Sequence, residues 1–130
     1  MKLVVTGGAG YVGSVCAAVL IDRGHEVIVV DNLSTGNRDA VPPKATFVEA
    51  DIMDPAMIEK AVGKADVIYN FAGLADIDES ILQPKITMEQ NVIGNVNILD
   101  ACKDLNFERY VYASSAYAFS NKGSFYGISK

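Results

Sequence analysis

The sequence contains no tryptophan, one histidine, two cysteines and four prolines in 130 residues. His25 has no second histidine with which to share a metal ion or a catalytic role, and we interpret it as a structural residue. Cys16 and Cys102 lie far apart without a C-x-x-C spacing, which leaves no recognisable zinc site or redox motif. We therefore expect no bound metal, and we expect both cysteines to be small, buried apolar side chains.

Long hydrophobic runs and an excess of basic charge are also missing. Glycines interrupt the short apolar stretch of the N-terminal MKLVVTGGAG, which predicts neither a signal peptide nor a membrane-spanning helix and favours a cytoplasmic location without a membrane partner. Eleven Lys and Arg residues, scattered among sixteen Asp and Glu, give a net charge of −5. Nucleic acid is therefore not expected as a partner. The composition is that of a globular protein of one domain.

The sequence does have a regular alternation of short apolar runs with longer segments of helical period. We expect strands at 2–6, 26–30, 46–49, 66–70 and 109–113, helices at 11–23, 55–62 and 84–105, and loops at 32–43 and 74–83. A turn through 114–124 leads into the start of another helix. This alternation predicts an α/β fold with a doubly wound parallel sheet of order 3-2-1-4-5. In such a sheet the ligand site lies beyond the carboxyl ends of the strands.

A glycine-rich segment, TGGAGYVGS, follows the first expected strand and satisfies G-x-G-x-x-G from Gly8. Such glycines permit a tight turn, let the backbone approach a pyrophosphate, and leave the N–H groups of the next helix aimed at an anion. Asp31, 18 residues beyond Gly13, is placed to accept hydrogen bonds from adenosine ribose hydroxyls and to repel a 2′-phosphate. The glycines alone also fit a tight turn that binds nothing; together with Asp31 they favour NAD over NADP.

Two charged positions leave alternatives open. Arg38, in the loop after the second strand, is either a residue that reaches a 2′-phosphate or a solvated loop charge. Asp51 and Ile52 follow the third strand, where they are placed to hold the edge of an adenine ring. An acidic flank for the next helix explains Asp51 and Asp54 almost as well.

The sequence ends in YGISK, in which Tyr126 and Lys130 are spaced to share one face of a helix. A phenol with an ordinary pKa of about 10 is a poor base at neutral pH, and a neighbouring ammonium favours its ionised form. Because such a pair also occurs by chance in helices, its meaning depends on the motifs that precede it.

In chain order, the glycine loop, Asp31, the NFAG of residues 70–73, Asn91, the serine pair 114–115 and YGISK resemble the extended short-chain dehydrogenases/reductases. More narrowly, they resemble the NAD-dependent epimerase/dehydratase family that acts on nucleotide sugars. VTGGAGYVGS and DNLSTG are especially similar to UDP-hexose 4-epimerases. The resemblance covers nearly the whole chain. It implies a Rossmann-type fold, NAD as cofactor, a UDP-linked sugar as substrate, a homodimer and a place in carbohydrate metabolism.

The resemblance also assigns roles by position. It implies that Ser115 aligns the substrate, that Tyr126 is the acid/base that takes a proton from a sugar hydroxyl, and that Lys130 holds the nicotinamide ribose. Gly94 is expected to permit close helix packing. The implied cofactor site consists of Gly7, Gly10, Tyr11, Val12, Gly13, Asp31, Asn32, Asp51, Ile52, Phe71, Ala72, Gly73, Asn91, Tyr126 and Lys130.

Two features depart from the family pattern. Only ten residues separate Ser115 from Tyr126, so part of the usual substrate-side loop is expected to be missing. The family continues past the lysine with further strands and a C-terminal substrate domain. We therefore expect residues 1–130 to be an incomplete NAD-binding Rossmann domain, inactive by itself, with Lys130 at a fraying end.

The sequence leaves two other functions open. The nearest alternative is a nucleotide-sugar dehydratase or dehydrogenase on the same scaffold, although Ala116 and Tyr117 stand where a sugar dehydratase carries an acid pair. The other is a non-catalytic module that binds NAD.

Overall fold

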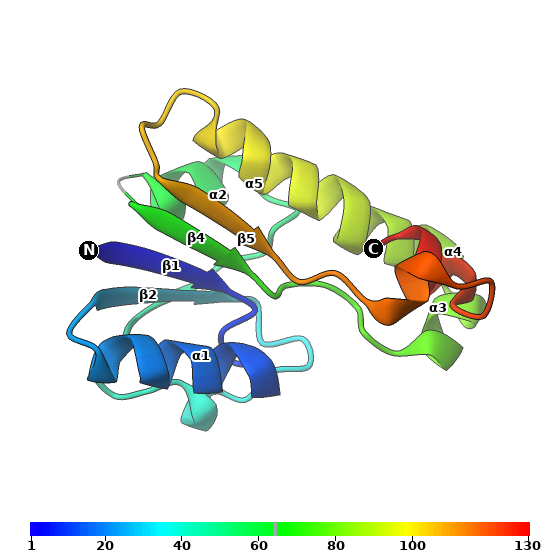
Figure 1. Ribbon diagram of the computed structural model, residues 1–130, viewed down its shortest axis with the longest axis horizontal. Coiled ribbons are helices and arrows are strands. Elements are labelled where there is room, and N and C mark those ends of the chain that lie inside the picture. Colours follow the sequence, from blue (N-terminus) through cyan, green and yellow to red (C-terminus); the bar gives the residue numbers. More distant parts are fainter. Residues whose placement is uncertain (64) are drawn as a thin grey trace.

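The computed structural model of the protein describes residues 1–63 and 65–130. At its centre lies a five-stranded parallel sheet in the order β3-β2-β1-β4-β5 (Figure 1). The predicted doubly wound α/β fold and its strand order are confirmed, and each strand boundary lies within one residue of the prediction. The strands are β1 (Lys2–Thr6), β2 (Glu26–Asp31), β3 (Thr46–Glu49), β4 (Val67–Asn70) and β5 (Arg109–Tyr112).

The central strands carry unbroken apolar runs because helices cover both faces of the sheet. On one face, Leu3 and Val5 lie in an apolar cluster with Leu20 of α1 (Tyr11–Asp22). On the other face, Val4 lies in a second cluster with residues of α2 (Pro55–Val62) and α5 (Gly94–Cys102). Figure 1 shows α1 on one side of the sheet and α2 and α5 on the other.

Residues of well-known capping types lie at the ends of the first two helices. Gly24, at a φ of +83°, lies just beyond α1, where a left-handed residue stops the helix. Asp54 caps α2 by accepting a hydrogen bond from the Met57 amide at 3.2 Å, and Pro55 occupies its first turn. The predicted loop after β2 contains one short helical turn, η1 (Arg38–Ala40).

The predicted loop over residues 74–83 is wrong in part, because residues Ile77–Leu82 form helix α3. Asp76 caps this helix by accepting a hydrogen bond from the Glu79 amide at 2.9 Å. Asp78 and Glu79 place negative charge in its first turn, where the helix dipole favours it. The polar composition that predicted a loop is therefore the composition of a helix start.

The predicted helix from Pro84 ends at Cys102, three residues earlier than expected. It consists of α4 (Pro84–Met88), a π-helical turn η2 (Glu89–Ile93) and α5. Val96 and Leu99 lie on the outer face of this helix and are 50% and 40% exposed. On the inner face a Cβ on Gly94 would come 2.7 Å from Ile52 Cγ1, so Gly94 permits close packing as predicted. In the part of the chain that the structure describes, no helix is long and apolar enough to cross a membrane.

The two cysteines differ in burial. Cys102 is 0% exposed in the core, as predicted, whereas Cys16 is only partly buried. Burial raises the pKa of the Cys102 thiol to about 11. An unfolded cysteine titrates at a pKa of about 8.5, so between these two pH values the unfolded chain has lost a proton that the folded chain keeps.

We predict that the free energy of unfolding falls as pH rises above about 8.5, by up to about 1.4 kcal/mol per pH unit from the Cys102 thiol. Urea unfolding of the wild type and of a Cys102→Ala variant at a series of pH values up to about 10 measures this slope. The variant should be less stable at every pH but should lose stability less steeply. Equal slopes in the two proteins would contradict the assignment, because Cys16 is present in both.

Candidate functional site

A cavity of about 610 Å³ opens where the loops after β1, β2, β3 and β4 meet. This is the carboxyl edge of the sheet, at the point where the strand order reverses between β1 and β4. The structure brings together every predicted cofactor residue up to position 73. The cavity is lined by Gly7, Gly10, Tyr11, Val12, Gly13, Asp31, Asn32, Asp51, Ile52, Phe71, Ala72 and Gly73.

The glycines of the loop after β1 are required for two different reasons: the packing of the protein itself and access of a ligand to the backbone. At Gly7, φ is +69° and a Cβ would come 2.7 Å from the Phe71 carbonyl carbon. At Gly13 a Cβ would overlap the Gly7 carbonyl oxygen, so the packing of the protein itself requires both residues. A Cβ on Gly10 would meet only the Gly7 carbonyl oxygen, at 3.3 Å. Gly10 lines the cavity, and its missing Cβ leaves room for a ligand to approach the backbone.

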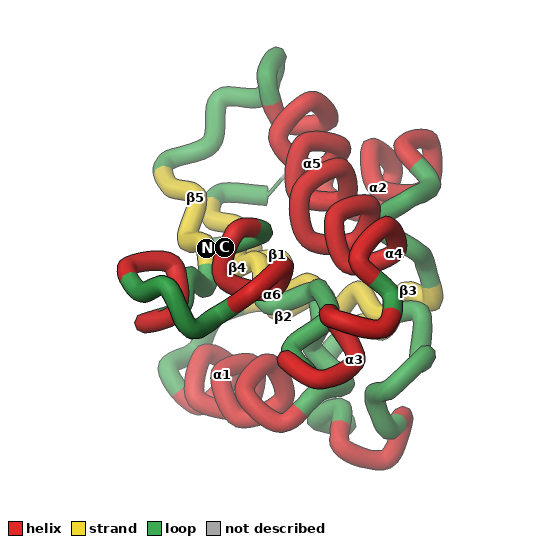
Figure 2. The backbone as a smooth tube through the Cα atoms, turned by 90° about the vertical axis from the view of Figure 1, so that its right-hand side faces the viewer, coloured by secondary structure: helices red, strands yellow, loops and turns green. Residues whose placement is uncertain are grey.

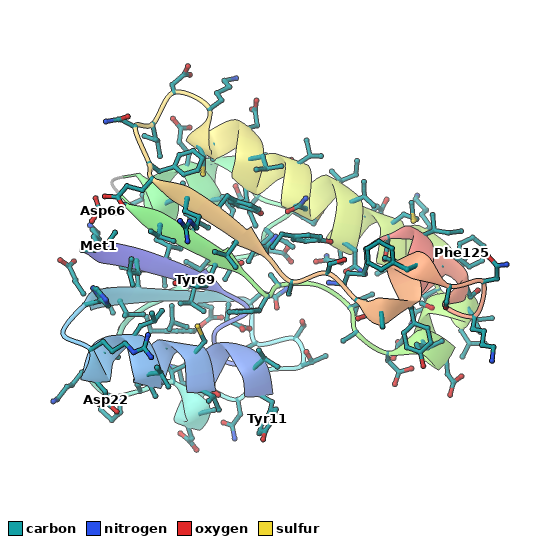
Figure 3. All side chains as sticks on the ribbon, in the orientation of Figure 1. Met1, Tyr11, Asp22, Asp66, Tyr69 and Phe125 are labelled. Atoms are coloured by element: carbon teal, nitrogen blue, oxygen red, sulfur yellow. The ribbon has the colours of Figure 1, made fainter. Side chains whose placement is uncertain are left out.

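The N-terminus of α1 is a ready site for an anion. Among the described residues, no side chain caps this helix and no acidic residue lies in its first turn. The first amide N–H groups of a helix have no partner within it, and the helix dipole makes this end positive. Tyr11, Val12 and Gly13 bring these amides to the cavity wall. Figure 3 shows the Tyr11 side chain pointing outward from the start of α1, and it is 88% exposed.

Asp31 ties two loops of the cavity together. One carboxylate oxygen accepts a hydrogen bond from the Ala9 amide at 2.9 Å, and the other accepts one from the Leu33 amide at 2.8 Å. Leu33 has a φ of +58°, so this turn is held in a left-handed conformation that leucine rarely adopts. Each carboxylate oxygen retains a lone pair, and Asp31 can therefore also accept hydrogen bonds from a ligand hydroxyl.

Asp51 faces the cavity, whereas Asp54 serves the next helix. Asp51 accepts hydrogen bonds from the Asn32 side-chain amide at 3.0 Å and from the Met53 amide at 2.8 Å. Asp54, and not Asp51, is the cap of α2. Of the two sequence interpretations, the helix flank therefore applies to Asp54. Among the described residues that line the cavity there is no Lys or Arg.

A buried polar network holds the turn of residues 71–73 to the sheet. Asn70 is 1% exposed, and its side-chain oxygen accepts hydrogen bonds from the Thr6 hydroxyl at 2.7 Å and the Ala72 amide at 3.1 Å. Its side-chain nitrogen donates to Asn95 and to the Tyr110 hydroxyl, each at 2.9 Å. All four hydrogen-bonding positions of the Asn70 amide are thus used, which specifies one position for the turn.

Asn91 does not line the cavity but connects it to the last helix. Its side-chain oxygen accepts a hydrogen bond from the Leu74 amide at 2.7 Å, and its nitrogen donates to the Leu74 carbonyl at 3.0 Å and to the Ser129 hydroxyl at 2.8 Å. Ser129 is buried and donates in turn to the Tyr126 carbonyl at 2.8 Å. Sequence analysis missed Ser129, and the only signal in the sequence is its position between Tyr126 and Lys130.

Tyr126 and Lys130 lie together in the structure. Helix α6 (Ser124–Ile128) packs beside α3 and α4 (Figure 2), and Lys130 follows just beyond its end. The Lys130 ammonium is 5.8 Å from the centre of the Tyr126 ring and 5.3 Å from that of Tyr112. It donates a hydrogen bond to the Ala113 carbonyl at 3.4 Å. These contacts hold Lys130 against the protein, and its burial lowers the pKa of the ammonium.

The Ser115 side chain makes a local hydrogen bond at the start of a short helix. It caps the short helix η3 (Ala116–Phe119), and its hydroxyl oxygen accepts a hydrogen bond from the Tyr117 amide at 3.2 Å. The centre of the Tyr117 ring lies 6.2 Å from that of the Tyr126 ring. Within residues 1–63 and 65–130, no hydrogen bond joins Ser115 to Tyr126 or Lys130. The structure therefore brings Tyr126 and Lys130 together, whereas the hydrogen bond made by the Ser115 side chain is a local one with Tyr117.

Ser115, Tyr126 and Lys130 are not among the residues that line the cavity. A Cβ on Gly73 would come 3.7 Å from the Lys130 ammonium, which places that ammonium at the Gly73 end of the cavity. Sequence analysis did not place several lining residues in the site, although the DNLSTG motif contains three of them. These are Val30, Ser34, Thr35, Gly36, Ala50, Leu74, Ala75, Ile86 and Gln90.

Comparisons with known proteins consistently match the chain to NAD-dependent epimerases. Residues 3–128 match the sequence profile described as the NAD dependent epimerase/dehydratase family. A UDP-glucose 4-epimerase of Corynebacterium glutamicum is 41% identical over 119 residues, which are 92% of this chain and 36% of the relative. A UDP-glucose 4-epimerase of Klebsiella pneumoniae is 32% identical over an alignment of 131 residues that covers 94% of this chain and 94% of the relative.

Solved structures agree with the sequence matches. A UDP-glucose 4-epimerase of Thermotoga maritima, with UDP-glucose, superposes with a TM-score of 0.94 at 28% identity and covers 100% of this chain and 48% of the other. The Thermus thermophilus UDP-glucose 4-epimerase in complex with NAD gives a TM-score of 0.84 at 36% identity, over 88% of this chain and 38% of the other. The chain thus spans less than half of the length of each of these two structures.

We predict that Gly13→Ala lowers the free energy of unfolding by about 2–3 kcal/mol, because the new Cβ overlaps backbone that cannot move aside. Gly10→Ala should cost about 1 kcal/mol or less, because only one contact tightens, by a few tenths of an ångström. Urea unfolding of both variants measures the difference. Equal losses would show that Gly10 is a packing glycine like Gly13 and would remove the argument for a ligand at this position.

Proposed function

The chain belongs to the NAD dependent epimerase/dehydratase family, and from this we propose that residues 1–130 are the NAD-binding Rossmann domain of a nucleotide-sugar 4-epimerase. The observation that carries the proposal is the convergence of the glycine loop, Asp31 and the turn 71–73 on one cavity. The relatives described as UDP-glucose 4-epimerases support a UDP-linked hexose as the substrate. We place the protein in the cytoplasm, in carbohydrate metabolism.

The cavity residues fit NAD by their chemistry. Gly10 leaves room for a pyrophosphate against the backbone, and the free amides of α1 are donors for its oxygens. Asp31 is the acceptor for adenosine ribose hydroxyls, with Asn32, Asp51 and Ile52 on the adenine side. Ala72 and Gly73, at the Lys130 end of the cavity, are the residues for the nicotinamide side.

The residues of this chain supply proton transfer and orientation, and NAD, when bound, supplies a reversible hydride acceptor. Tyr126 takes the proton of the sugar hydroxyl and later returns it. The charged form of Lys130, next to the Tyr126 ring, favours the phenolate. Ser115 holds the reacting oxygen by a hydrogen bond. The link from Asn91 through Ser129 to the Tyr126 carbonyl keeps the base aligned with the turn that carries Gly73.

We predict that the 130-residue chain binds NAD in a calorimetric titration, and that NADP binds at least about tenfold more weakly because its extra phosphate meets the Asp31 charge. Gly10→Ala should stay folded by circular dichroism but lose most of its NAD affinity. Gly63→Ala, at the end of α2 and away from this cavity, is the matched control and should bind NAD normally. A folded wild-type chain that binds no NAD would show that the proposed cofactor is wrong.

A Tyr126→Phe variant, made in a protein as long as the relatives, separates catalysis from binding. Turnover of a UDP-hexose should fall by about a hundredfold or more, with NAD affinity unchanged, because the ring stays and only the proton-transferring hydroxyl is lost. NAD binding without any turnover in the wild type would instead identify a non-catalytic NAD-binding module. Net oxidation or loss of water from the sugar would identify a dehydrogenase or a dehydratase.

We also infer a homodimer in which the outer face of the helix from Pro84 to Cys102 packs against a second copy. Ile93, Val96 and Leu99 form an apolar stripe on this face and are all 40% exposed or more. Val96→Glu should shift the sedimentation coefficient from dimer to monomer, because the charge would be buried at the contact. Val19→Glu, on the exposed side of α1, is the control. A wild type that sediments as a monomer at all concentrations rules the dimer out.

A further inference from the structure

The backbone of Arg38 lies beside the cavity, but Arg38 is not one of the lining residues. It is the first residue of η1, two positions after Gly36, which does line the cavity. The backbone here is anchored to the glycine loop, since the Asn37 amide donates to the Ala9 carbonyl at 3.0 Å. Asn37 also caps η1 by accepting a hydrogen bond from the Asp39 amide at 2.9 Å. The start of the Arg38 side chain is therefore held close to the Asp31 end of the cavity.

The guanidinium group of Arg38 turns away from that end. Its central carbon lies 4.3 Å from the centre of the Phe47 ring, in a cation–π contact. Phe47 is paired with Val29, whereas Asp31 is paired with Glu49, so the ring stands two residues behind Asp31 along the strands. At about 3.3 Å per residue, this places the ring roughly 7 Å from the level of Asp31, toward the amino edge of the sheet.

The cavity is left with an acidic character as a result. Asp31 and Asp51 line it, and no described lining residue is Lys or Arg. A dinucleotide with a 2′-phosphate brings almost two further negative charges to the adenosine ribose that Asp31 serves. A guanidinium is the side chain that best matches a phosphate, because its planar donors bind two oxygens at once. Arg38 has the chemistry to accept such a ligand, and the contact with Phe47 withdraws it.

We propose that Phe47 is a specificity-determining residue that keeps the protein selective for NAD by holding Arg38 away from the cavity. The inference rests on the proposed NAD site and extends it to a positioning residue that touches no ligand. It also resolves the two interpretations of Arg38 left open by the sequence. On this proposal Arg38 in the native protein is not a phosphate ligand: it is an exposed loop cation whose guanidinium stacks on Phe47 of the edge strand.

The test compares NAD and NADP affinities in four proteins by calorimetry at one ionic strength: wild type, Phe47→Leu, Arg38→Gln and the double variant. Phe47→Leu keeps an apolar side chain but removes the aromatic face. It should tighten NADP binding about threefold to fivefold, the most that release of an exposed cation–π contact supplies, and change NAD binding by less than about twofold, since only NADP gains a charged partner. Arg38→Gln should behave like the wild type, and the double variant should lose the gain. The gain should also shrink as salt is raised, as expected for a phosphate contact.

Each outcome bears on the proposal. Unchanged NADP affinity in folded Phe47→Leu overturns it while the NAD site stands, because NAD is titrated into the same protein. A gain that persists in the double variant shows that Arg38 is not the partner and overturns it as well. If the folded wild type binds neither dinucleotide, the proposed function fails and this inference fails with it. Phe47→Met is the second variant if Phe47→Leu does not fold by circular dichroism.

Discussion

The close approach of Gly7 to the backbone of Phe71 and Ala72 is the constraint on which the rest of the site depends. It requires a left-handed residue without a Cβ, and only glycine meets both conditions at no steric cost. The Gly7 amide donates to the Val30 carbonyl at 2.8 Å, and the Phe71 amide donates to the Thr6 carbonyl at 3.0 Å. The turns after β1, β2 and β4 therefore meet at one point, and the cavity is the space that they enclose.

Buried polar side chains connect this meeting point to the catalytic candidates. Asn70 fixes the turn 71–73 against β1 through Thr6, and Asn91 fixes the next residue, Leu74, by two hydrogen bonds. Asn91 also holds Ser129, which lies between Tyr126 and Lys130. Such buried groups are costly unless every donor and acceptor is paired, so a satisfied network specifies one arrangement. In this way the cofactor side of the cavity and the expected base are parts of one hydrogen-bonded unit.

Most of the fold and about half of the site were predictable, and the errors have identifiable physical causes. The strands were predictable because buried parallel strands are short apolar runs bounded by glycine, asparagine and aspartate. Helix α3 was missed because the residues that start a helix, such as Asp76 and Asp78, have the same polar character as a loop. Ile86 and Gln90 were missed because they come from a helix that reaches the cavity from the side, away from the ends of the strands. Their positions depend on the crossing of helix and sheet, for which a single sequence contains no local signal.

By itself the sequence determined the glycine loop and the acidic residue after β2, which follow from local spacing and residue type, and the order of the strands, which follows from the alternation of strands and helices. Its motifs, taken together, carried the resemblance to the family. The direction of the Arg38 side chain, the burial of Lys130 and the role of Ser129 were decided only by the tertiary structure. Each of them depends on a partner far away in the chain: Phe47 on the edge strand, the Ala113 carbonyl after β5 and Asn91 on the long helix. Sequence patterns report which groups a segment offers, whereas the chain's packing selects which of those groups meet.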